Sequence, residues 1–537
     1  MADKTGQLPI QPVERPILCS PYEMPDLHWL YDTKTGEPRK NPGRRDAGYW
    51  YKTDKVGGAQ TKLFVEEERD DIELVNAVRK DVNRWRESKY RGASNVTKDL
   101  LSHWASADRP RRLFFCQREA VETIIYLAEI RIPGRSSRTL FQDFAVTDKD
   151  IQQLLKGERP GFYQTATDYF PTLIDPSPDA SILPLQRLGC KMATGSGKTV
   201  VMAMLISWAF CNRGVNPSST EFPNAVLVVC PNLTVRERLQ VLRPEDAKNY
   251  YIEFDIVPTK YRPLMQKGRV LVTNWHLFNP QSEHEEGGKT YAVVNKGPET
   301  PETFAKRILG DDLYDRMPIM VLNDEGHHCW RPLSNGDDDA LPGTNGEGSE
   351  EEAEEAKVWA GGLDKLNNSN PDGPKARGIS LCVDLSATPF YIGGSGHPEG
   401  RPFPWLVSDF GLVDAIESGI VKIPRMPVMD VTGLPDPKYF KLWETIRAGL
   451  QPADFLPGKA RRPKPAVVYK YAEGALQQLA GQWKERFEYV ERATPGQEHV
   501  PPVMIVVCDN TDIARIGLSE DQRRNTDGAS HAGRHRG

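Results

Sequence analysis

Short runs of valine, isoleucine and leucine recur between residues 187 and 385, and each gap between them is long enough for a helix. The runs are RLGCKM (187–192), AVLVVC (225–230), VLVT (270–273), IMVL (319–322) and ISLCVDL (379–385). A strand covered on both faces is apolar throughout, whereas a strand with one face in water alternates apolar and polar residues. We therefore expect an α/β fold in which helices cover both faces of a parallel sheet.

The first run leads into a glycine-rich loop, MATGSGKT, and an apolar helical segment (198–211) follows. Glycines let backbone N–H groups approach a phosphate closely, and the start of a helix favours negative charge. In such loops the lysine reaches the β and γ phosphates and the hydroxyl residue ligates Mg²⁺. The usual pattern places glycine where this chain has Met192. The residues expected to bind ATP and its Mg²⁺ here are Thr194, Gly195, Ser196, Gly197, Lys198 and Thr199.

The fourth run delivers two acids, in IMVLNDEGHH, to the carboxyl end of its strand. Ligands of an open parallel sheet bind at that edge. We expect Asp324 to hold Mg²⁺ and Glu325 to polarise the attacking water. His327 completes a D-E-x-H pattern and joins the expected catalytic set of Lys198, Asp324 and Glu325. His328 is expected to pack or cap rather than to take part in chemistry.

The glycine loop, the D-E-x-H box and the later S-A-T tripeptide resemble, in this order, motifs of superfamily 2 DEAD/DEAH-box-like helicases and translocases. In that superfamily the S-A-T motif links ATP hydrolysis to movement on DNA, which implies a coupling role for Ser386, Ala387 and Thr388. RRLFFCQREAVETI (111–124) resembles the adenine-reading Q motif. The resemblance implies that Gln117 reads adenine, and an amide can both donate to and accept from the base edge.

Two further segments resemble DNA-contacting motifs of the same superfamily, CPNLTVRERL (230–239) and TNWHLF (273–278). Loops after strands offer N–H and hydroxyl groups that suit phosphate contacts. Ordinary turns after strands are the alternative. The candidate DNA-binding residues in these segments are Asn232, Thr234, Thr273 and Asn274.

A closer resemblance is to the helicase–nuclease (Res) subunits of type III restriction enzymes. It rests on FFCQREAVETIIYL, MATGSGKT, LVTNWHLF, NDEGHHCW, LSATPFYIGGSG and VSDFGLVDAIESGIVKIPR. The resemblance spans roughly residues 45–515. It implies a motor on double-stranded DNA that works with a DNA methyltransferase (Mod-like) partner, and a nuclease domain beyond the motor. The one E-x-K tripeptide that hints at such a nuclease, Glu355–Lys357, lies in an acidic segment and is expected to be solvated loop or helix.

The same resemblance predicts the organisation of the chain. We expect a partly disordered and then helical N-terminal region (1–105), a RecA-like ATP-binding lobe (106–395), a linker with helices (396–500), and the start of a second RecA-like lobe with a disordered tail (501–537). The apolar run 503–508 is expected to be the opening strand of that incomplete second lobe.

The expected second lobe ends before the motifs that would supply an arginine finger, and such a residue is worth about 10³–10⁵ in rate. We therefore expect the chain to be truncated and nucleotide binding to survive better than hydrolysis. The sequence is consistent with two functions. One is an ATP-dependent DNA motor, and the other is a nucleotide-binding fragment that contacts DNA or a partner and hydrolyses little ATP. A measurement of ATPase activity with and without double-stranded DNA separates them.

Charge and cysteine usage bear on the partners. Residues 332–356 contain nine acids and no lysine or arginine, so removing them would change the net charge from −5 to +4. The remainder can present a basic face to DNA, and the aromatic–basic clusters GYWYKT (48–53) and RWRESKYRG (84–92) either contact DNA or pack in the core.

Eight cysteines without a C-x-x-C pair fit a reducing cytoplasm. The longest apolar run, 199–211, would span only about 20 Å as a helix, so we expect no membrane contact.

Overall fold

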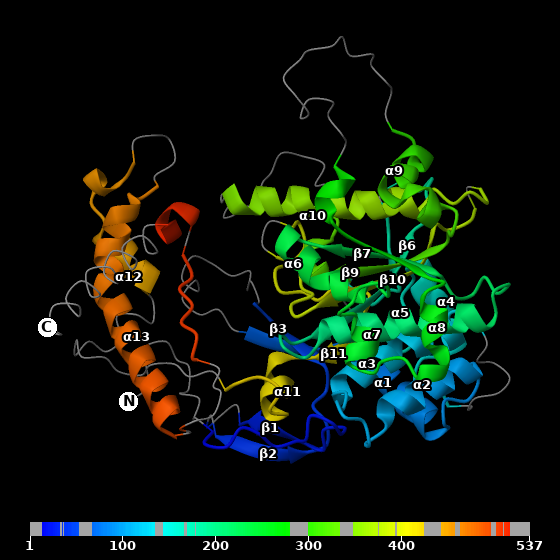
Figure 1. Cartoon of the computed structure of the whole chain (residues 1–537), viewed down its shortest axis with the longest axis horizontal. Coiled ribbons are helices and arrows are strands. Elements are labelled where there is room, and N and C mark those ends of the chain that lie inside the picture. Colours follow the sequence, from blue (N-terminus) through cyan, green and yellow to red (C-terminus); the bar gives the residue numbers. More distant parts are fainter. Residues whose placement is uncertain are drawn as a thin grey trace, which may run out of the picture. The chain divides into compact units, whose positions relative to one another are not determined.

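The apolar runs of the sequence become the central strands of one sheet in the computed structural model of the protein (Figure 1). The structure describes residues 13–32, 35, 37–52, 67–134, 143–165, 169–177, 179–279, 299–332, 347–373, 375–392, 395–423, 442–456, 462–493, 495, 501–508 and 510–515. The chain divides into two compact units, Met1–Ile423 and Pro424–Gly537. None of the helices in the described ranges is both long and apolar enough to cross a lipid bilayer.

Within the described residues, the first unit contains a seven-stranded sheet in which the order along the main path is β11-β6-β10-β9-β7-β8. Its strands are β5 (Ile174–Asp175), β6 (Leu185–Met192), β7 (Ala225–Cys230), β8 (Arg269–Asn274), β9 (Ile319–Asp324), β10 (Ile379–Ser386) and β11 (Leu406–Phe410). The strands of the main path are parallel, and β5 pairs with β6 in the antiparallel direction. Strand β10 therefore lies between β6, which leads to the glycine loop, and β9, which leads to the acidic box.

Helices cover both faces of this sheet (Figure 1). Along β7, Val226 and Val228 belong to one apolar cluster, and Leu227 and Val229 belong to another. The first cluster includes residues of α1 (Glu73–Glu87), α2 (Asn95–Ala105), α3 (Phe115–Ile125) and α5 (Lys198–Val215). The second includes residues of α9 (Pro301–Tyr314) and α10 (Glu347–Asn367). This arrangement confirms the predicted RecA-like α/β fold.

Shorter helices complete the first unit. They are α4 (Asp148–Lys156), α6 (Leu233–Arg238), α7 (Tyr250–Glu253), α8 (Arg262–Met265) and α11 (Leu412–Glu417), with the 3₁₀ helices η3 (Leu239–Leu242), η4 (Thr259–Tyr261), η5 (Trp275–Phe278) and η6 (Gly326–His328). A π-helical turn, η1 (Tyr126–Arg131), continues α3. We expected helices at about 116–130 and 233–242, and each of these segments contains a change of helix type.

The N-terminal region is more ordered than we expected from its sequence. Strands β1 (Leu27–Tyr31) and β2 (Pro38–Pro42) form an antiparallel pair, and so do β3 (Gly48–Lys52) and β4 (Glu67–Asp71). The segment before β1 is held by α11, because the N–H groups of Leu18 and Cys19 donate to the carbonyl oxygen of Glu417. Such long-range contacts leave no periodic signal in the sequence, so the prediction of loose order was wrong for the described part of 1–44.

The acidic segment 332–378 was expected to interrupt the fold as a polar insertion, and this was wrong for its second half. Residues 347–367 form α10, in which Trp359, Leu363 and Leu366 are buried against the sheet. Their spacing of four and three residues places them on one face of the helix. The neighbouring acids hid this apolar face from the sequence reading, and residues 333–346 lie outside the described ranges.

Two predictions near the end of the chain also differ from the structure. Strand β11 lies in a stretch that we expected to be a link after residue 395, and it pairs with β6 in the same sheet. The second unit contains α12 (Leu442–Gly449), the 3₁₀ helix η7 (Pro452–Asp454) and α13 (Pro465–Ala493), which match the predicted helices. The run 503–508 is not a strand, since it has no pairing partner among the described residues, and Val507 is 91% exposed. The arginines of the expected disordered tail, Arg523, Arg524, Arg534 and Arg536, lie outside the described ranges.

Candidate nucleotide site

The loops that follow β6, β9 and β10 lie together at one edge of the sheet. The strands are parallel, and β10 pairs with both of the others, so their carboxyl ends meet there. In the register, Leu385 is opposite both Cys190 of β6 and Asp324 of β9. Open parallel sheets bind ligands at this edge. The structure thus brings the glycine loop, the D-E-x-H box and the S-A-T tripeptide into one place.

The glycine loop has the backbone shape that its glycines allow. Gly195 and Gly197 have φ values of +83° and +90°, in the region that only glycine adopts without strain. Helix α5 begins at Lys198, directly after the second glycine. Ser196 is fully buried, and its hydroxyl donates to the carbonyl oxygen of Ala193 at 2.6 Å. Thr194 and Gly195 are exposed and Thr199 is half-buried, so the outer side of the loop is open to a ligand.

Gln117 lies against the glycine loop. Its Nε2 donates to the carbonyl oxygen of Ser196 at 3.0 Å, and its Oε1 accepts from the N–H of Phe114 at 2.9 Å. A Cβ atom at Gly197 would be only 2.1 Å from Gln117 Nε2, so this contact requires glycine there. The contact makes Gln117 a brace for the loop. Its adenine-reading role stays a prediction.

Lys198 and Glu325 form an ion pair across the edge, with Nζ and Oε1 2.7 Å apart. Their side chains are 13% and 30% exposed. Glu325 has a left-handed backbone, with φ of 52°, which an L residue adopts at a cost of about 1–3 kcal/mol. The pair joins the glycine loop, which is expected to bind phosphate, to the D-E-x-H box, which is expected to catalyse hydrolysis. Residues with a strained backbone, such as Glu325, are common at functional sites.

Asp324 is buried, being 7% exposed, at the last position of β9. Burial raises its pKa to about 6, and the neighbouring charge of Glu325 adds to the rise, against the opposing effect of Lys198. The negative charge at this position is therefore incompletely compensated by the protein. A cation supplied by a ligand would compensate it.

His327 connects the acidic box to the S-A-T tripeptide. Its Nδ1 lies 2.8 Å from Ser386 Oγ and 3.4 Å from Glu325 Oε2. Burial, together with the charge of His328, lowers the pKa of His327 to about 4, so this imidazole is neutral at pH 7. The N–H of Thr388 donates to Ser386 Oγ at 3.0 Å. The predicted coupling residues thus touch the acidic box through Ser386, whereas Ala387 is half-buried and Thr388 is exposed.

The sequence reading missed a buried polar cluster beneath the site. Asn323 is 0% exposed and Asp384 is 2% exposed, and Asn323 Nδ2 donates to Asp384 Oδ1 at 2.7 Å. Arg187 of β6 donates from Nε to Asp384 Oδ2 at 2.9 Å. Gly326 fits because a Cβ there would lie 2.7 Å from Asp384 Cβ. The available signal was a charged or amide residue within the apolar run of each of three strands, since buried polar groups are costly unless they are paired.

The weaker DNA-binding candidates lie on the neighbouring strands. Asn232 follows β7 and Asn274 ends β8, where Cys230 and Asn274 are register partners. Asn232 Oδ1 accepts from the N–H of Val235 and caps α6, and Asn274 Nδ2 lies 3.3 Å from His276 Nδ1. Thr234 is exposed and Thr273 is buried.

The aromatic–basic cluster 84–92 packs inward instead. Trp85 is 0% exposed, and Tyr90 is buried and donates to Glu122 at 2.6 Å. The core alternative therefore holds for both aromatic rings of this cluster.

The donor set at the site fits a nucleotide with Mg²⁺ better than a metal alone. No group of three or more His, Cys, Asp or Glu side chains among the described residues is arranged to hold a metal ion. Magnesium commonly takes one or two carboxylates and completes its shell with phosphate oxygens and water. Asp324 and the Thr199 hydroxyl are the groups that would contribute to such a shell, beside the glycine cradle.

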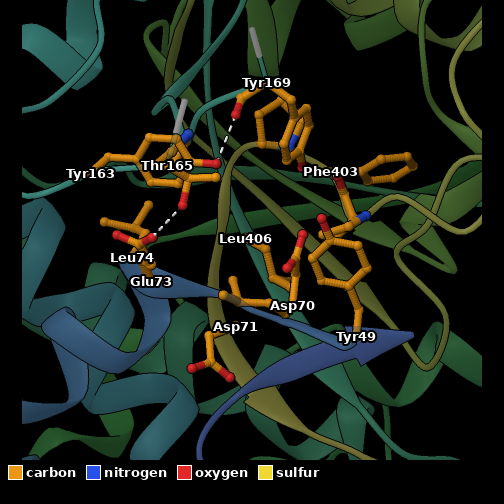
Figure 2. A pocket seen from close by; sticks show the side chains of 14 residues that line it. Tyr49, Asp70, Asp71, Glu73, Leu74, Tyr163, Thr165, Tyr169, Phe403 and Leu406 are labelled. Atoms are coloured by element: carbon orange, nitrogen blue, oxygen red, sulfur yellow. Dashed lines mark hydrogen bonds between the residues drawn. The ribbon is translucent and has the colours of Figure 1, made fainter. Parts of the chain in front are cut away.

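A small cavity elsewhere in the first unit is separate from this site (Figure 2). It has a volume of about 60 Å³ and is lined by residues of β3, β4 and β11 and by the segment around Tyr163. The Tyr163 hydroxyl donates to the carbonyl oxygen of Tyr169 at 2.8 Å, and Thr165 donates to Glu73 at 2.9 Å. Its lining residue Leu406 begins β11, so the cavity lies at the amino end of that strand, away from the glycine loop.

Comparison with known proteins assigns the central part of the chain. Residues 182–338 match the family model described as type III restriction enzyme, res subunit. No curated protein and no solved structure gives a significant match. The matched residues include strands β6, β7, β8 and β9, the glycine loop and the acidic box. Residues 182–338 are therefore similar to the helicase-like domain of the type III restriction enzyme res subunit family.

Proposed function

We propose that the site binds ATP with Mg²⁺ and hydrolyses it when double-stranded DNA is bound. The ion pair between Lys198 and Glu325 is the observation that carries this proposal. It joins a phosphate-binding lysine to an acid that is suited to orient water, at the edge of the sheet where nucleotides bind.

The residues have separate roles in this proposal. Lys198 exchanges Glu325 for the phosphates when the nucleotide binds, and the released carboxylate of Glu325 then orients and polarises the attacking water. Asp324 and Thr199 hold Mg²⁺, which neutralises charge on the phosphates when it is bound. The backbone N–H groups of the glycine loop bind the phosphates, with Gln117 keeping the loop in shape.

The proposed motor works on DNA within a restriction–modification system. The His327–Ser386 contact supports this part, because it gives the S-A-T tripeptide a direct connection to the acidic box. The loops that contain Asn232 and Asn274 are proposed to contact the DNA backbone. A methyltransferase subunit is the proposed partner, and the cytoplasm is the proposed location.

The test is a measurement of phosphate release with and without double-stranded DNA, together with a fluorescent-nucleotide binding assay. We expect turnover that DNA stimulates and that the Lys198→Ala substitution lowers by about 10²–10³. Binding without turnover, with or without DNA, would favour the alternative of a nucleotide-binding fragment that contacts DNA or a partner. Absence of both binding and turnover would overturn the proposal.

A further inference from the structure

We propose that helix α10 mechanically links the loop after β8 to the acidic box after β9, and that Trp359 and Gly362 are positioning residues of this link. The inference rests on the proposed function, because it assigns the regulation of the same site. It concerns a helix that lies within the acidic segment and outside the D-E-x-H and S-A-T motifs.

The first end of the link is at Asn323, the residue directly before Asp324. Trp359 Nε1 donates to Asn323 Oδ1 at 3.2 Å, and both side chains are 0% exposed. Asn323 Nδ2 is bound to Asp384, so the tryptophan supplies the hydrogen bond of its other end. Loss of that partner would leave a buried amide oxygen unsatisfied, which costs about 1–3 kcal/mol of stability. The orientation of Asn323, and with it the start of the acidic box, is therefore tied to α10.

Two further contacts join α10 to the residues that follow the box. His328 Nδ1 lies 3.8 Å from Glu355 Oε1, and Arg331 Nη2 donates to Asp364 Oδ1 at 2.7 Å. Asp364 is 8% exposed, which shields its pair with Arg331 from solvent. The helix thus holds the chain on both sides of Asp324 and Glu325.

The second end of the link is at Phe278, which is 3% exposed and ends η5 after β8. A Cβ atom at Gly362 would lie 2.5 Å from Phe278 Cγ, so the helix reaches this ring only because position 362 is glycine. Arg307 of α9 donates to the carbonyl oxygen of Leu277 at 2.9 Å. The segment that follows Asn274 therefore contacts both α9 and α10.

The two ends lie on one face of the helix. Trp359 and Gly362 are three residues apart, and residues at that spacing are neighbours on a helix surface. A shift of the loop after β8 therefore moves the same helical turn that hydrogen-bonds Asn323. This gives DNA at the loop a direct path to the geometry of the box, and a misplacement of about 1 Å there can cost about 100-fold in rate.

The adjacent glycines of α10 provide a matched pair of variants. Gly361→Ala adds a methyl group where no atom lies within 4 Å, whereas Gly362→Ala adds one against Phe278. Both substitutions raise helix propensity to the same extent. A difference between the two variants therefore reports the contact of position 362 with Phe278. Trp359→Phe removes the N–H donor and keeps a ring. Its control is Trp104→Phe, since Trp104 is also buried and donates to a neutral acceptor, the carbonyl oxygen of Ile256 at 2.8 Å.

Turnover and hydrogen–deuterium exchange are measured for all four variants of the full chain. We expect Gly362→Ala and Trp359→Phe to lower the stimulation of turnover by DNA roughly ten-fold, with KM for ATP unchanged. We expect Gly361→Ala and Trp104→Phe to retain it. Exchange should rise in both 269–278 and 319–328 in the Gly362→Ala variant, and in 319–328 in the Trp359→Phe variant.

Other outcomes separate the two proposals. A wild-type chain without turnover would contradict the proposed function, and the exchange measurement then decides the link alone. Faster exchange confined to 269–278 in the Gly362→Ala variant, or equal loss of stimulation in the Gly361→Ala variant, would overturn the link. If Gly362→Ala does not fold, the Trp359→Phe variant tests the link by itself. The link would be overturned if DNA stimulation of turnover and the exchange rates in this variant were the same as in the wild-type chain.

Discussion

Buried charges occur in two regions of the same sheet, and the protein compensates them to different degrees. In the interior, Arg187 contacts Asp384 at 2.9 Å, and although burial opposes its charge, this carboxylate helps to raise the pKa of Arg187 above its ordinary value. At the edge, Asp324 has Lys198 nearby but also the like charge of Glu325, and its pKa rises to about 6. The interior charges are satisfied by the protein itself, and the charge at the edge is not.

This difference separates scaffold from site. Asp384 accepts from Arg187 of β6, from Asn323 of β9 and from Trp405, which directly precedes β11. Both of its carboxylate oxygens are therefore engaged by the protein. A buried charge pair is costly to break but adds little over apolar packing. The negative charge of Asp324 at the edge is incompletely compensated, so it stabilises the fold less than a fully paired charge would. A bound cation would supply the missing compensation.

The largest effect is expected from breaking the interior cluster. Arg187→Met leaves the buried carboxylate of Asp384 without its cation, and Asp175 keeps only its pair with Arg331. Breaking a buried ion pair in this way costs about 3–5 kcal/mol. Urea unfolding followed by circular dichroism measures this loss. Arg236→Met is the control, because the Arg236–Glu237 pair is exposed. Equal stability of the two variants would contradict the assignment of Arg187 to the scaffold.

The next effect is expected at the edge and should appear in rate rather than in stability. Lys198→Ala removes the cation that meets the developing phosphate charge, and loss of one such group costs about 10²–10³ in kcat. The free energy of unfolding should change by less than about 1 kcal/mol, because the pair is partly exposed. Turnover and urea unfolding are measured on the same preparation, with Lys260→Ala as an exposed control. A large loss of stability would place Lys198 with the scaffold.

A smaller effect follows from the pKa of Asp324. Its pKa rises from 3.8 when unfolded to about 6 when folded, so the folded state binds its proton more tightly. Stability from this group is present below pH 4 and is lost as the pH rises through about 6, and the loss is about 3 kcal/mol by pH 8. Asp324→Asn cannot lose it and should therefore gain relative stability as the pH rises from about 4 to about 7. A difference between the two proteins that is independent of pH would contradict this assignment.

The smallest effect is expected where a charge pair is neither buried nor in the site. Lys306 and Glu302 are 2.9 Å apart on α9, at positions i and i+4, and both are exposed. Lys306→Ala should change the free energy of unfolding by about 0.3–0.5 kcal/mol. A change above about 1 kcal/mol in urea unfolding would show that burial does not decide the worth of charges in this fold.

The sequence predicted the sheet and the edge residues because both follow from local rules. Apolar runs predicted the strands, and the residues that follow parallel strands meet at one edge, which brought Lys198, Glu325 and Ser386 together. The contacts of Gln117 with Ser196, and of Trp359 with Asn323, join residues far apart in the chain. Their partners depend on packing, which no local pattern encodes.

Helix α10 shows why part of the fold was missed. Its acids dominate the composition of the segment, whereas its packing depends on a few apolar residues on one face, such as Trp359 and Leu363. The opposite error occurred at 503–508, where an apolar run suggested a strand. A strand needs a partner for its hydrogen bonds, and hydrophobicity alone does not supply one.

The tight fit of Gly326 against Asp384 has an evolutionary consequence. A Cβ at position 326 would lie 2.7 Å from Asp384 Cβ, so even alanine requires either η6 or β10 to shift. Moving β10 would also disturb the hydrogen bonds of Asp384 with Asn323 and Arg187. Substitutions at positions 326 and 384 should therefore occur together in lineages that keep this sheet, and a glycine in the acidic box should be inherited with the buried aspartate.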